Sequence, residues 1–143
     1  MSQTIEDILN DKGADIYSVT PESSVFDAIR KMAELGIGAL LVTEGGRPVG
    51  MLSERDYARK VILQGRASRE TRVAEIMSSP LITIGREAKA SDGLNLMTEK
   101  RIRHLPVIEG EQLIGVVSIG DLVNAVMADQ KLLIEGFERY VYG

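Results

Sequence analysis

The first half of the chain changes its hydrophobic pattern several times, and each change predicts a new secondary-structure element. Thr20-Pro21 ends a short strand-like run, and Ser24 with Asp27 resembles a capping box in front of apolar residues at helical spacing. Turn residues Glu44 to Pro48 separate two further apolar runs that suit buried strands. The predicted elements are a strand over 16–19, a helix from Val25 to about Gly36, strands over 37–42 and 49–52, and a helix from Ser53 to about Gly65.

The second half shows the same order of patterns. Gly93 weakens its first predicted helix by about 1 kcal/mol relative to Ala. Glu109-Gly110-Glu111 predicts the turn of a hairpin. The predicted elements are a strand over 82–84, a helix over 90–100, hairpin strands over 105–108 and 113–117, and a helix from Ser118. The tail keeps an apolar stripe at helical spacing (Leu133, Ile134, Phe137, Tyr140 and Val141), which requires a partner surface.

The two halves are copies of one unit. When the chain is shifted by 65 residues, 13 of the 48 pairs from Tyr17/Ile82 to Gln64/Asp129 are identical, whereas unrelated segments of this composition would give about three. The predicted fold is therefore mixed α/β (α+β), with two tandem β-α-β-β-α repeats. We assign residues 1–65 to the first repeat with an N-terminal segment, 66–72 to a linker, 73–129 to the second repeat and 130–143 to a helical tail.

A unit of this size buries too little surface alone, so we expect the two repeats to pack about a pseudo-twofold axis. Clefts between subdomains are where small ligands bind. We therefore look for ligand-binding residues near the ends of the predicted strands.

Composition excludes several kinds of site. The chain of 143 residues has no cysteine and one histidine, His104, so disulfides, thiolate metal sites and clusters of histidine ligands are excluded. A net charge of −4 and the absence of Trp argue against nucleic acid as the main partner. The N-terminus lacks the features of a signal peptide, and no apolar run reaches the ~20 residues of a membrane span. We expect a cytoplasmic protein.

The sequence Gly-x-x-Ser-x-x-Asp occurs once in each repeat. The copies are Gly50 to Asp56, with Ser53, and Gly115 to Asp121, with Ser118. Ser-x-x-Asp at a strand-to-helix junction is also a helix capping box, which stabilises a helix by about 1 kcal/mol without any ligand. A carboxylate at a helix start can alternatively accept hydrogen bonds from the two hydroxyls of a ribose. The Gly three residues before each Ser would let a ligand approach the backbone.

Basic residues precede the same strand in the second repeat only. The segment Lys100 to Pro106 includes Arg103 and His104, and Arg presents a planar fork suited to phosphate. Lys100 and Arg101 fit a solvated helix end equally well. The equivalent positions in the first repeat are Gly38 and Ala39, so the two clefts should differ.

Two further sets of residues have weaker signals. Arg55, Arg59 and Lys60 lie about one turn apart on a predicted helix, where they form either a solvated face or a phosphate contact. Ser18 and Thr83 occupy equivalent strand positions, from which a hydroxyl could reach a base or a phosphate.

Together these residues resemble a pair of cystathionine-β-synthase (CBS) domains, often called a Bateman module. The resemblance covers about residues 8–129, and it rests on the two Gly-x-x-Ser-x-x-Asp motifs, Val73 to Met77 and Arg103 to Val107. Ser53 to Lys60 resembles a bacterial and organellar subgroup. The resemblance implies an adenine nucleotide ligand (AMP, ADP or ATP), or S-adenosylmethionine or NAD(H), bound between the repeats. It also implies a homodimer.

The resemblance also implies a role for each matching residue. The more complete site contains Asp121 and Ser118 for the ribose, Arg103 and His104 for phosphate, and Thr83 and Pro106 on the adjoining strands. The second contains Asp56, Ser53, Arg55, Ser18 and Ala39. Phosphate binding there departs from the family pattern unless Arg55 or Arg59 substitutes for the missing cations.

Three functions follow as alternatives. The first is a nucleotide-sensing module that regulates a separate protein, because the chain leaves no room for an attached catalytic domain. The second is an interaction or scaffold protein with vestigial clefts. The third is an enzyme, which we do not expect, because His104 has no acidic neighbour in the sequence to complete a nucleophile and base pair.

Overall fold

In the computed structural model, which describes residues 2–142, the chain forms two compact units. The inner unit is residues 16–81, and the outer unit combines the segment before residue 16 with the segment from Ile82 onward. Each unit has its own hydrophobic core. None of the helices within residues 2–142 combines the length and hydropathy needed to cross a bilayer.

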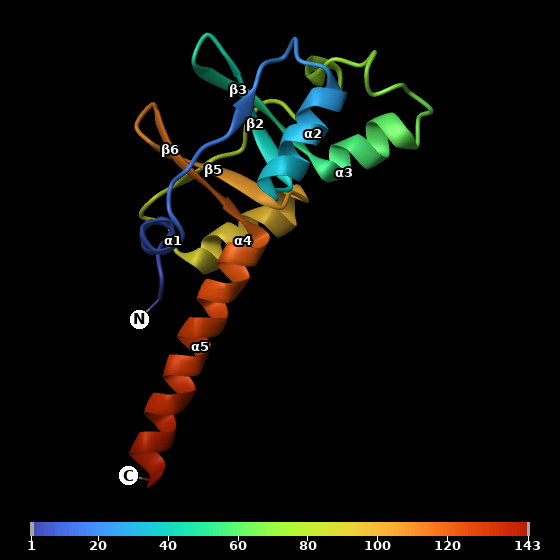
Figure 1. Cartoon of the computed structure of the whole chain (residues 1–143). Coiled ribbons are helices and arrows are strands. Elements are labelled where there is room, and N and C mark those ends of the chain that lie inside the picture. The colour runs from blue at the N-terminus through green and yellow to red at the C-terminus, as the bar shows by residue number, and fades with distance from the viewer. Residues whose placement is uncertain (1, 143) are drawn as a thin grey trace. The chain divides into compact units, whose positions relative to one another are not determined.

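The inner unit contains a three-stranded sheet in the order β1-β2-β3, with β1 parallel and β3 antiparallel to β2. Helix α2 begins after Ser24, whose side chain accepts a hydrogen bond from the Asp27 N–H, and ends at Gly36 in the left-handed conformation. The elements are β1 (Ser18–Val19), α2 (Val25–Leu35), β2 (Ala39–Glu44), β3 (Arg47–Ser53), α3 (Glu54–Tyr57), the π-helical turn η1 (Ala58–Ile62) and the 3-10 turn η2 (Val73–Glu75) (Figure 1).

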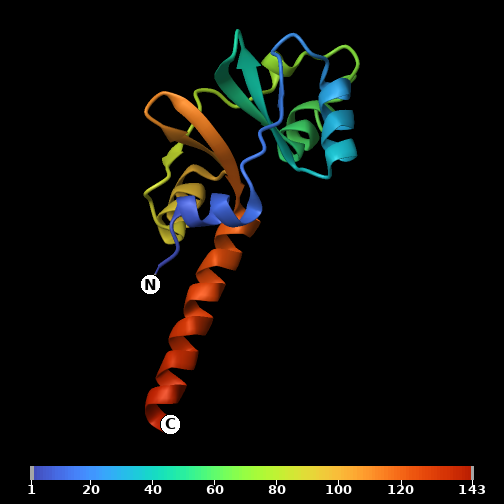
Figure 2. The ribbon, with the colours of Figure 1, turned by 60° about the vertical axis from the view of Figure 1, so that its left-hand side comes forward.

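The outer unit repeats this topology, with strand order β4-β5-β6 and the same parallel and antiparallel pairings. Its elements are α1 (Ile5–Lys12), β4 (Ile84–Gly85), α4 (Ala90–Lys100), β5 (His104–Glu109), β6 (Gln112–Ser118) and α5 (Ile119–Tyr142) (Figure 2). The predicted β-α-β-β-α order is confirmed in both repeats. The predicted hairpins are also confirmed, with Gly45, Gly46 and Gly110 at positive φ in their turns.

Strands β1 and β4 are shorter than predicted, at two residues each. In the inner unit the Leu41 N–H also donates to the Tyr17 carbonyl, just before β1. Pro106 stands at the equivalent position of β5 and has no N–H to donate. The chain ahead of β4 therefore lacks the hydrogen bond that the inner repeat makes.

The two cores use equivalent positions of the repeats, such as Met32 and Met97 or Leu40 and Leu105. The outer unit differs at Gly93, a buried residue of α4 that faces the core. A Cβ on Gly93 would lie 2.7 Å from Leu122 Cδ1, and Leu122 is fully buried. The glycine that weakens α4 as an isolated helix therefore allows α4 and α5 to pack closely.

The segment ahead of each repeat packs with the other repeat. The N–H groups of Ile5 and Glu6 donate to the carbonyls of Ala88 and Arg86 at 2.9 Å each. In the inner unit, those of Val73 and Ala74 donate to the carbonyls of Ser23 and Pro21, at 2.9 and 3.0 Å. These acceptors are equivalent residues of the two repeats. We call residues 3–9 and 71–77 the lead-in segments.

The lead-in segments explain why the compact units differ from the boundaries that we assigned from the sequence. Residues 2–15 complete the second repeat rather than the first, because α1 buries Ile5, Ile8 and Leu9 in the outer core and packs against β6 and α5. The expected linker is also packed, since the Val25 N–H donates to the Thr71 carbonyl. The tail is not a separate helix, because it continues α5 without a break.

Candidate functional site

Both Ser-x-x-Asp motifs form capping boxes. The Ser118 N–H donates to Asp121 Oδ2 at 2.8 Å, and the Asp121 N–H donates to Ser118 Oγ at 3.2 Å. In the inner unit the corresponding distances between Ser53 and Asp56 are 2.9 and 3.2 Å. The capping interpretation of the motif is therefore confirmed. It leaves Oδ1 of each carboxylate, which takes no part in the cap, as a possible acceptor for a ligand.

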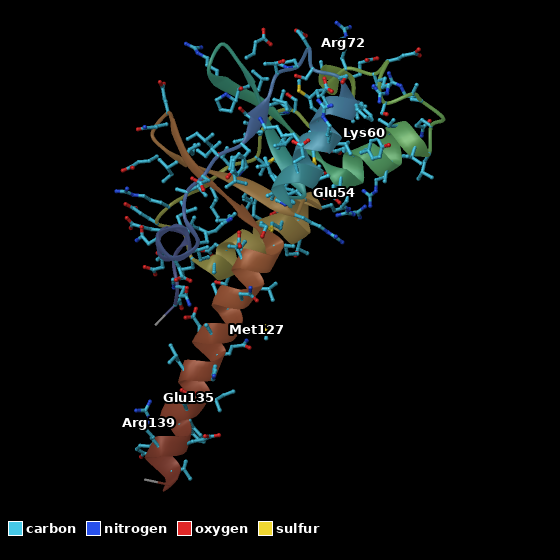
Figure 3. The ribbon with its side chains drawn as sticks, in the orientation of Figure 1. Glu54, Lys60, Arg72, Met127, Glu135 and Arg139 are labelled. Carbon is cyan, nitrogen blue, oxygen red and sulfur yellow. The ribbon has the colours of Figure 1, made fainter. Side chains whose placement is uncertain are left out.

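A lysine contacts each motif aspartate, and the two lysines come from different parts of the fold. Lys12 at the end of α1 donates to Asp121 Oδ2 at 2.7 Å and to the Val116 carbonyl at 3.0 Å. Lys60, labelled in Figure 3, lies 3.4 Å from Asp56 Oδ1 and donates to the Ile76 carbonyl at 3.0 Å. Each ammonium group therefore connects a motif aspartate to another segment of its unit.

The two lysines come from non-equivalent positions of the duplicated sequence, yet each one pairs with the motif aspartate of its unit. The second-repeat residue equivalent to Lys60 is Ala125, a core residue that cannot pair with a carboxylate. Lys12 instead supplies the ammonium group for Asp121, from an extra turn of helix beyond the lead-in segment. The sequence predicts either a solvated face or a phosphate contact for Lys60, and it gives no signal for Lys12.

The two motif glycines face the lead-in segments. A Cβ on Gly115 would lie 2.7 Å from Leu9 Cδ2, and a Cβ on Gly50 would lie 2.8 Å from Met77 Sδ and 2.9 Å from the Ser78 carbonyl. The sequence predicts that these glycines let a ligand approach the backbone. In the structure the space beside each glycine is filled by a residue in or next to a lead-in segment, and this packing explains why neither position has a side chain.

The hairpin brings the second-repeat candidates together. His104 pairs with Ser118 in the register of β5 and β6, and the Ile119 N–H donates to the Arg103 carbonyl at 2.8 Å. Arg103 is exposed and His104 is half-buried. These backbone contacts hold Arg103 and His104 beside the start of α5, where Asp121 lies.

Electrostatics at this point favour an ionised carboxylate and a neutral imidazole. Burial raises the pKa of Asp121, but hydrogen bonds from Lys12 and Ser118 outweigh it and hold that pKa below its ordinary value. Burial lowers the pKa of His104, as do the charges of Lys12 and Arg103, against the opposing effect of Asp121. At neutral pH the group is one carboxylate with two cations, which suits a ligand with hydroxyl and phosphate groups.

The inner unit has a similar backbone but fewer charges. Ala39 pairs with Ser53 in the register of β2 and β3, and the Glu54 N–H donates to the Gly38 carbonyl at 3.0 Å. Neither Gly38 nor Ala39 offers a cation. Arg55 lies half-buried in α3, and Arg59 is exposed in η1. Phosphate binding here would therefore depend on Arg55 or Arg59, as the sequence indicates.

The remaining candidates lie on or next to the strands. Ser18 begins β1, and its carbonyl accepts a 2.6 Å hydrogen bond from Lys31 Nζ. Thr83 directly precedes β4 and is half-buried. Pro106 is buried in β5 and pairs with Val116. The backbone positions of these residues are therefore defined, and among residues 2–142 neither the Ser18 nor the Thr83 hydroxyl has a hydrogen-bond partner.

Comparison with known proteins identifies the repeats. The model of the CBS domain family matches residues 5–62 and again residues 73–128. The mitochondrial CBS domain-containing protein CBSX3 of Arabidopsis thaliana is 39% identical over 151 aligned residues, which cover 99% of this chain and 73% of the plant protein. Both matches extend across the two repeats that the internal comparison defined.

Solved structures agree with this match. A CBS-domain protein from Burkholderia ambifaria MC40-6 is 51% identical, with a TM-score of 0.85, and the match covers 90% of this chain and 96% of the other. The hexameric CBS-CP12 protein of bloom-forming cyanobacteria is 27% identical, with a TM-score of 0.77, over 86% of this chain and 71% of its own. The chain belongs to the CBS domain family and contains two copies of the domain.

Proposed function

We propose that this protein is a regulatory module that binds an adenine nucleotide of the AMP, ADP or ATP class and acts on a separate partner protein. The observation that carries the proposal is the cluster around Asp121, an ionised carboxylate at a helix start beside Arg103 and His104. The carboxylate matches the ribose hydroxyls of a nucleotide, and the Arg103 guanidinium, with the neutral His104 imidazole as a possible hydrogen-bond donor, matches its phosphates. Thr83 and Pro106 adjoin the site through β4 and β5.

The inner unit supports a weaker second site. Asp56 and Ser53 reproduce the capped carboxylate, with Ser18 and Ala39 on the neighbouring strands. Because Gly38 and Ala39 replace Arg103 and His104, we propose that this site prefers an adenosine-containing ligand with little phosphate, unless Arg55 supplies a contact. S-adenosylmethionine or NAD(H) is the alternative ligand class.

A non-catalytic role fits the chemistry of the cluster. Asp121, whose charge acts on the His104 pKa, accepts hydrogen bonds from Lys12 Nζ and the Ser118 N–H rather than from the imidazole. A catalytic base is oriented by a hydrogen bond from its imidazole to such a carboxylate, so this arrangement does not prepare His104 to activate a nucleophile. We therefore propose binding rather than turnover, and release of phosphate or pyrophosphate from ATP by the purified protein would contradict this.

The test is calorimetric titration of the purified protein with AMP, ADP, ATP, NAD(H) and S-adenosylmethionine. We expect micromolar binding to one of them, lost in Asp121→Ala. Asp92→Ala is the matched control, because Asp92 Oδ2 accepts the Lys89 N–H at 3.1 Å and so caps α4 in the same unit without lying in the cluster. Binding lost equally in both variants would indicate damage to the fold.

A scaffold function is the second candidate, and the capping boxes favour it. Both motifs have a sufficient structural reason to exist, because each one caps a helix without a ligand. Absence of binding to all five ligands, in a protein that still self-associates, would support the scaffold function and contradict the nucleotide proposal.

We also propose that the protein forms a homodimer through one face of α5. Side chains at alternating spacings of four and three residues form a seam along this helix, and only Gln130 among them is polar (Val123, Met127, Gln130, Ile134, Phe137 and Val141). Met127, Ile134, Phe137 and Val141 are each more than half exposed. Figure 3 labels Met127 on the seam and Glu135 and Arg139 away from it.

A second copy of α5 is the occupant that suits this seam. The heptad spacing is self-complementary, and Lys131 and Glu138 flank it at the same heptad position. In two helices that run in opposite directions, Lys131 of one copy lies near Glu138 of the other. Light scattering after size exclusion should show a dimer, which Ile134→Lys with Phe137→Glu converts to a monomer and Glu135→Gln leaves intact. A monomeric wild-type protein would contradict the proposal.

A further inference from the structure

The end of α1 contacts Asp121, the motif aspartate of the outer unit. Lys12 is the last residue of α1, and its Nζ lies between Asp121 Oδ2, at 2.7 Å, and the Val116 carbonyl, at 3.0 Å. The side chains of Lys12 and Asp121 are 38% and 23% exposed, so the pair lies where solvent or a ligand can reach it. It joins residues 109 positions apart in the chain.

The contact occupies the acceptor that a ribose needs. A carboxylate oxygen has two lone pairs, and Asp121 Oδ2 already accepts the Ser118 N–H and Lys12 Nζ. Oδ1 keeps its own two lone pairs, but a ribose diol that binds a carboxylate with one hydroxyl on each oxygen also needs a lone pair on Oδ2. Lys12 has to leave for that two-oxygen contact to form, because the Ser118 N–H belongs to the start of α5 and cannot leave without breaking the cap.

We propose that the contact between Lys12 and Asp121 holds α1 against the Asp121 site, and that a ribose-containing ligand breaks this contact. We call the contact the latch. The inference rests on the proposed nucleotide function. When Lys12 withdraws, α1 loses both hydrogen bonds of its last side chain. What then remains is the packing of Ile5, Ile8 and Leu9, the backbone bonds of the lead-in segment, the Gln3 N–H bond to Asp129 and a 3.9 Å pair between Glu6 and Arg86. An eight-residue helix is marginal without such tertiary contacts.

Release of α1 would give the ligand a structural output. Ile5 is fully buried, and Ile8 and Leu9 are more than nine-tenths buried. Leu9 fills the space beside Gly115. Loosening α1 exposes this apolar face and the backbone at Gly115 together, and a partner protein can recognise such a change. The inner unit has a different arrangement, because Lys60 is on the motif's own helical segment, 3.4 Å from Asp56.

Two measurements on the whole chain of 143 residues test the latch, with adenosine as the probe because it has the ribose but no phosphate for Lys12 to attract. Lys12→Met should bind adenosine about three- to tenfold more tightly than wild type, since the hydroxyls no longer compete with an ammonium group. Lys100→Met, an equal change of charge at the exposed end of α4, should leave the affinity unchanged.

Amide hydrogen exchange over residues 5–12 gives the second measurement. Adenosine should speed exchange in α1 of the wild type, and Lys12→Met should show faster exchange already without ligand. The latch alone is overturned if Asp121→Asn abolishes adenosine binding, while adenosine leaves the exchange of α1 unchanged and Lys12→Met binds adenosine with the wild-type affinity. Absence of adenosine and nucleotide binding in the wild type and in Lys12→Met overturns the proposed function and the latch with it.

Discussion

Gly50→Ala distinguishes a packing role for the motif glycines from a ligand-binding role. The new Cβ would lie 2.8 Å from Met77 Sδ and 2.9 Å from the Ser78 carbonyl oxygen. Met77 can change rotamer, but Ser78 cannot easily move. Its carbonyl accepts the Met51 N–H at 3.0 Å and its N–H donates to the Met51 carbonyl at 2.8 Å. Any shift that relieves the overlap strains both hydrogen bonds.

The size of the effect follows from these contacts. Overpacking of a well-packed site costs about 1–3 kcal/mol, and Ala instead of Gly recovers about 0.4–1 kcal/mol by restricting the unfolded chain. We expect the free energy of unfolding to fall by about 1–2 kcal/mol. For a chain of this size the melting temperature should then fall by about 4–8 °C.

The assay is thermal and urea unfolding followed by circular dichroism, with Gly85→Ala as the matched control. Gly85 has no heavy atom within 4 Å of its Cβ position and no positive φ, so its replacement should raise the free energy of unfolding by about 0.4–1 kcal/mol, the unfolded-chain gain without the overlap. If Gly50→Ala unfolds like the wild type but loses nucleotide binding, the packing argument is refuted and the glycine serves ligand approach.

Three further predictions concern the core, the acid response and the inner aspartate. Gly93→Ala should destabilise the protein by about 1–2 kcal/mol despite the better helix propensity of Ala, because its Cβ meets Leu122 at 2.7 Å. Leu122→Ala should then lower the free energy of unfolding less in Gly93→Ala than in the wild type. Additive losses in a double-mutant cycle would contradict an overlap between the new Cβ and Leu122. Stability should decline as pH falls below about 6.5, because the pKa of folded His104 is lowered and the unfolded chain takes up the proton first. His104→Gln should flatten that decline in urea unfolding between pH 7.5 and 5.5, and an unchanged slope would contradict the assignment. Lys60→Met should cost less than about 1 kcal/mol in thermal unfolding, because its pair with Asp56 is 3.4 Å long and Lys60 is 45% exposed, and a larger loss would contradict this estimate.

Local patterns in the sequence predicted most of the secondary structure. Helix α4 has its predicted bounds, and α2 lies between its predicted cap and stop. These signals are readable because a cap or a turn involves residues three or four positions apart. Helix α1 was missed although Thr4 and Asp7 form a capping box that follows the same rule. Ile5, Ile8 and Leu9 also have helical spacing, but the segment is only eight residues long and lies ahead of the repeats, so the pattern was not read as a helix.

The candidate site was predicted in part. The sequence identified Asp121, Ser118, Arg103 and His104, because duplication points to equivalent positions and the strand-to-helix junction brings near neighbours together. It did not identify Lys12, whose contact with Asp121 spans 109 residues, and the lysine that contacts the other motif aspartate comes from a different position of its repeat. The ligand roles of all these residues remain proposals.

The sequence by itself determined the repeat, the order of elements in each copy and the family resemblance. All of these depend on the identity and spacing of residues along the chain. Only the tertiary structure decided that the segment ahead of each repeat completes the other repeat. It also decided that Gly50, Gly93 and Gly115 make room for neighbouring side chains, and that Lys12 donates a hydrogen bond to Asp121. The physical reason is that these contacts join residues distant in the chain. Their partners depend on which surfaces fold against each other, and no local pattern contains that information.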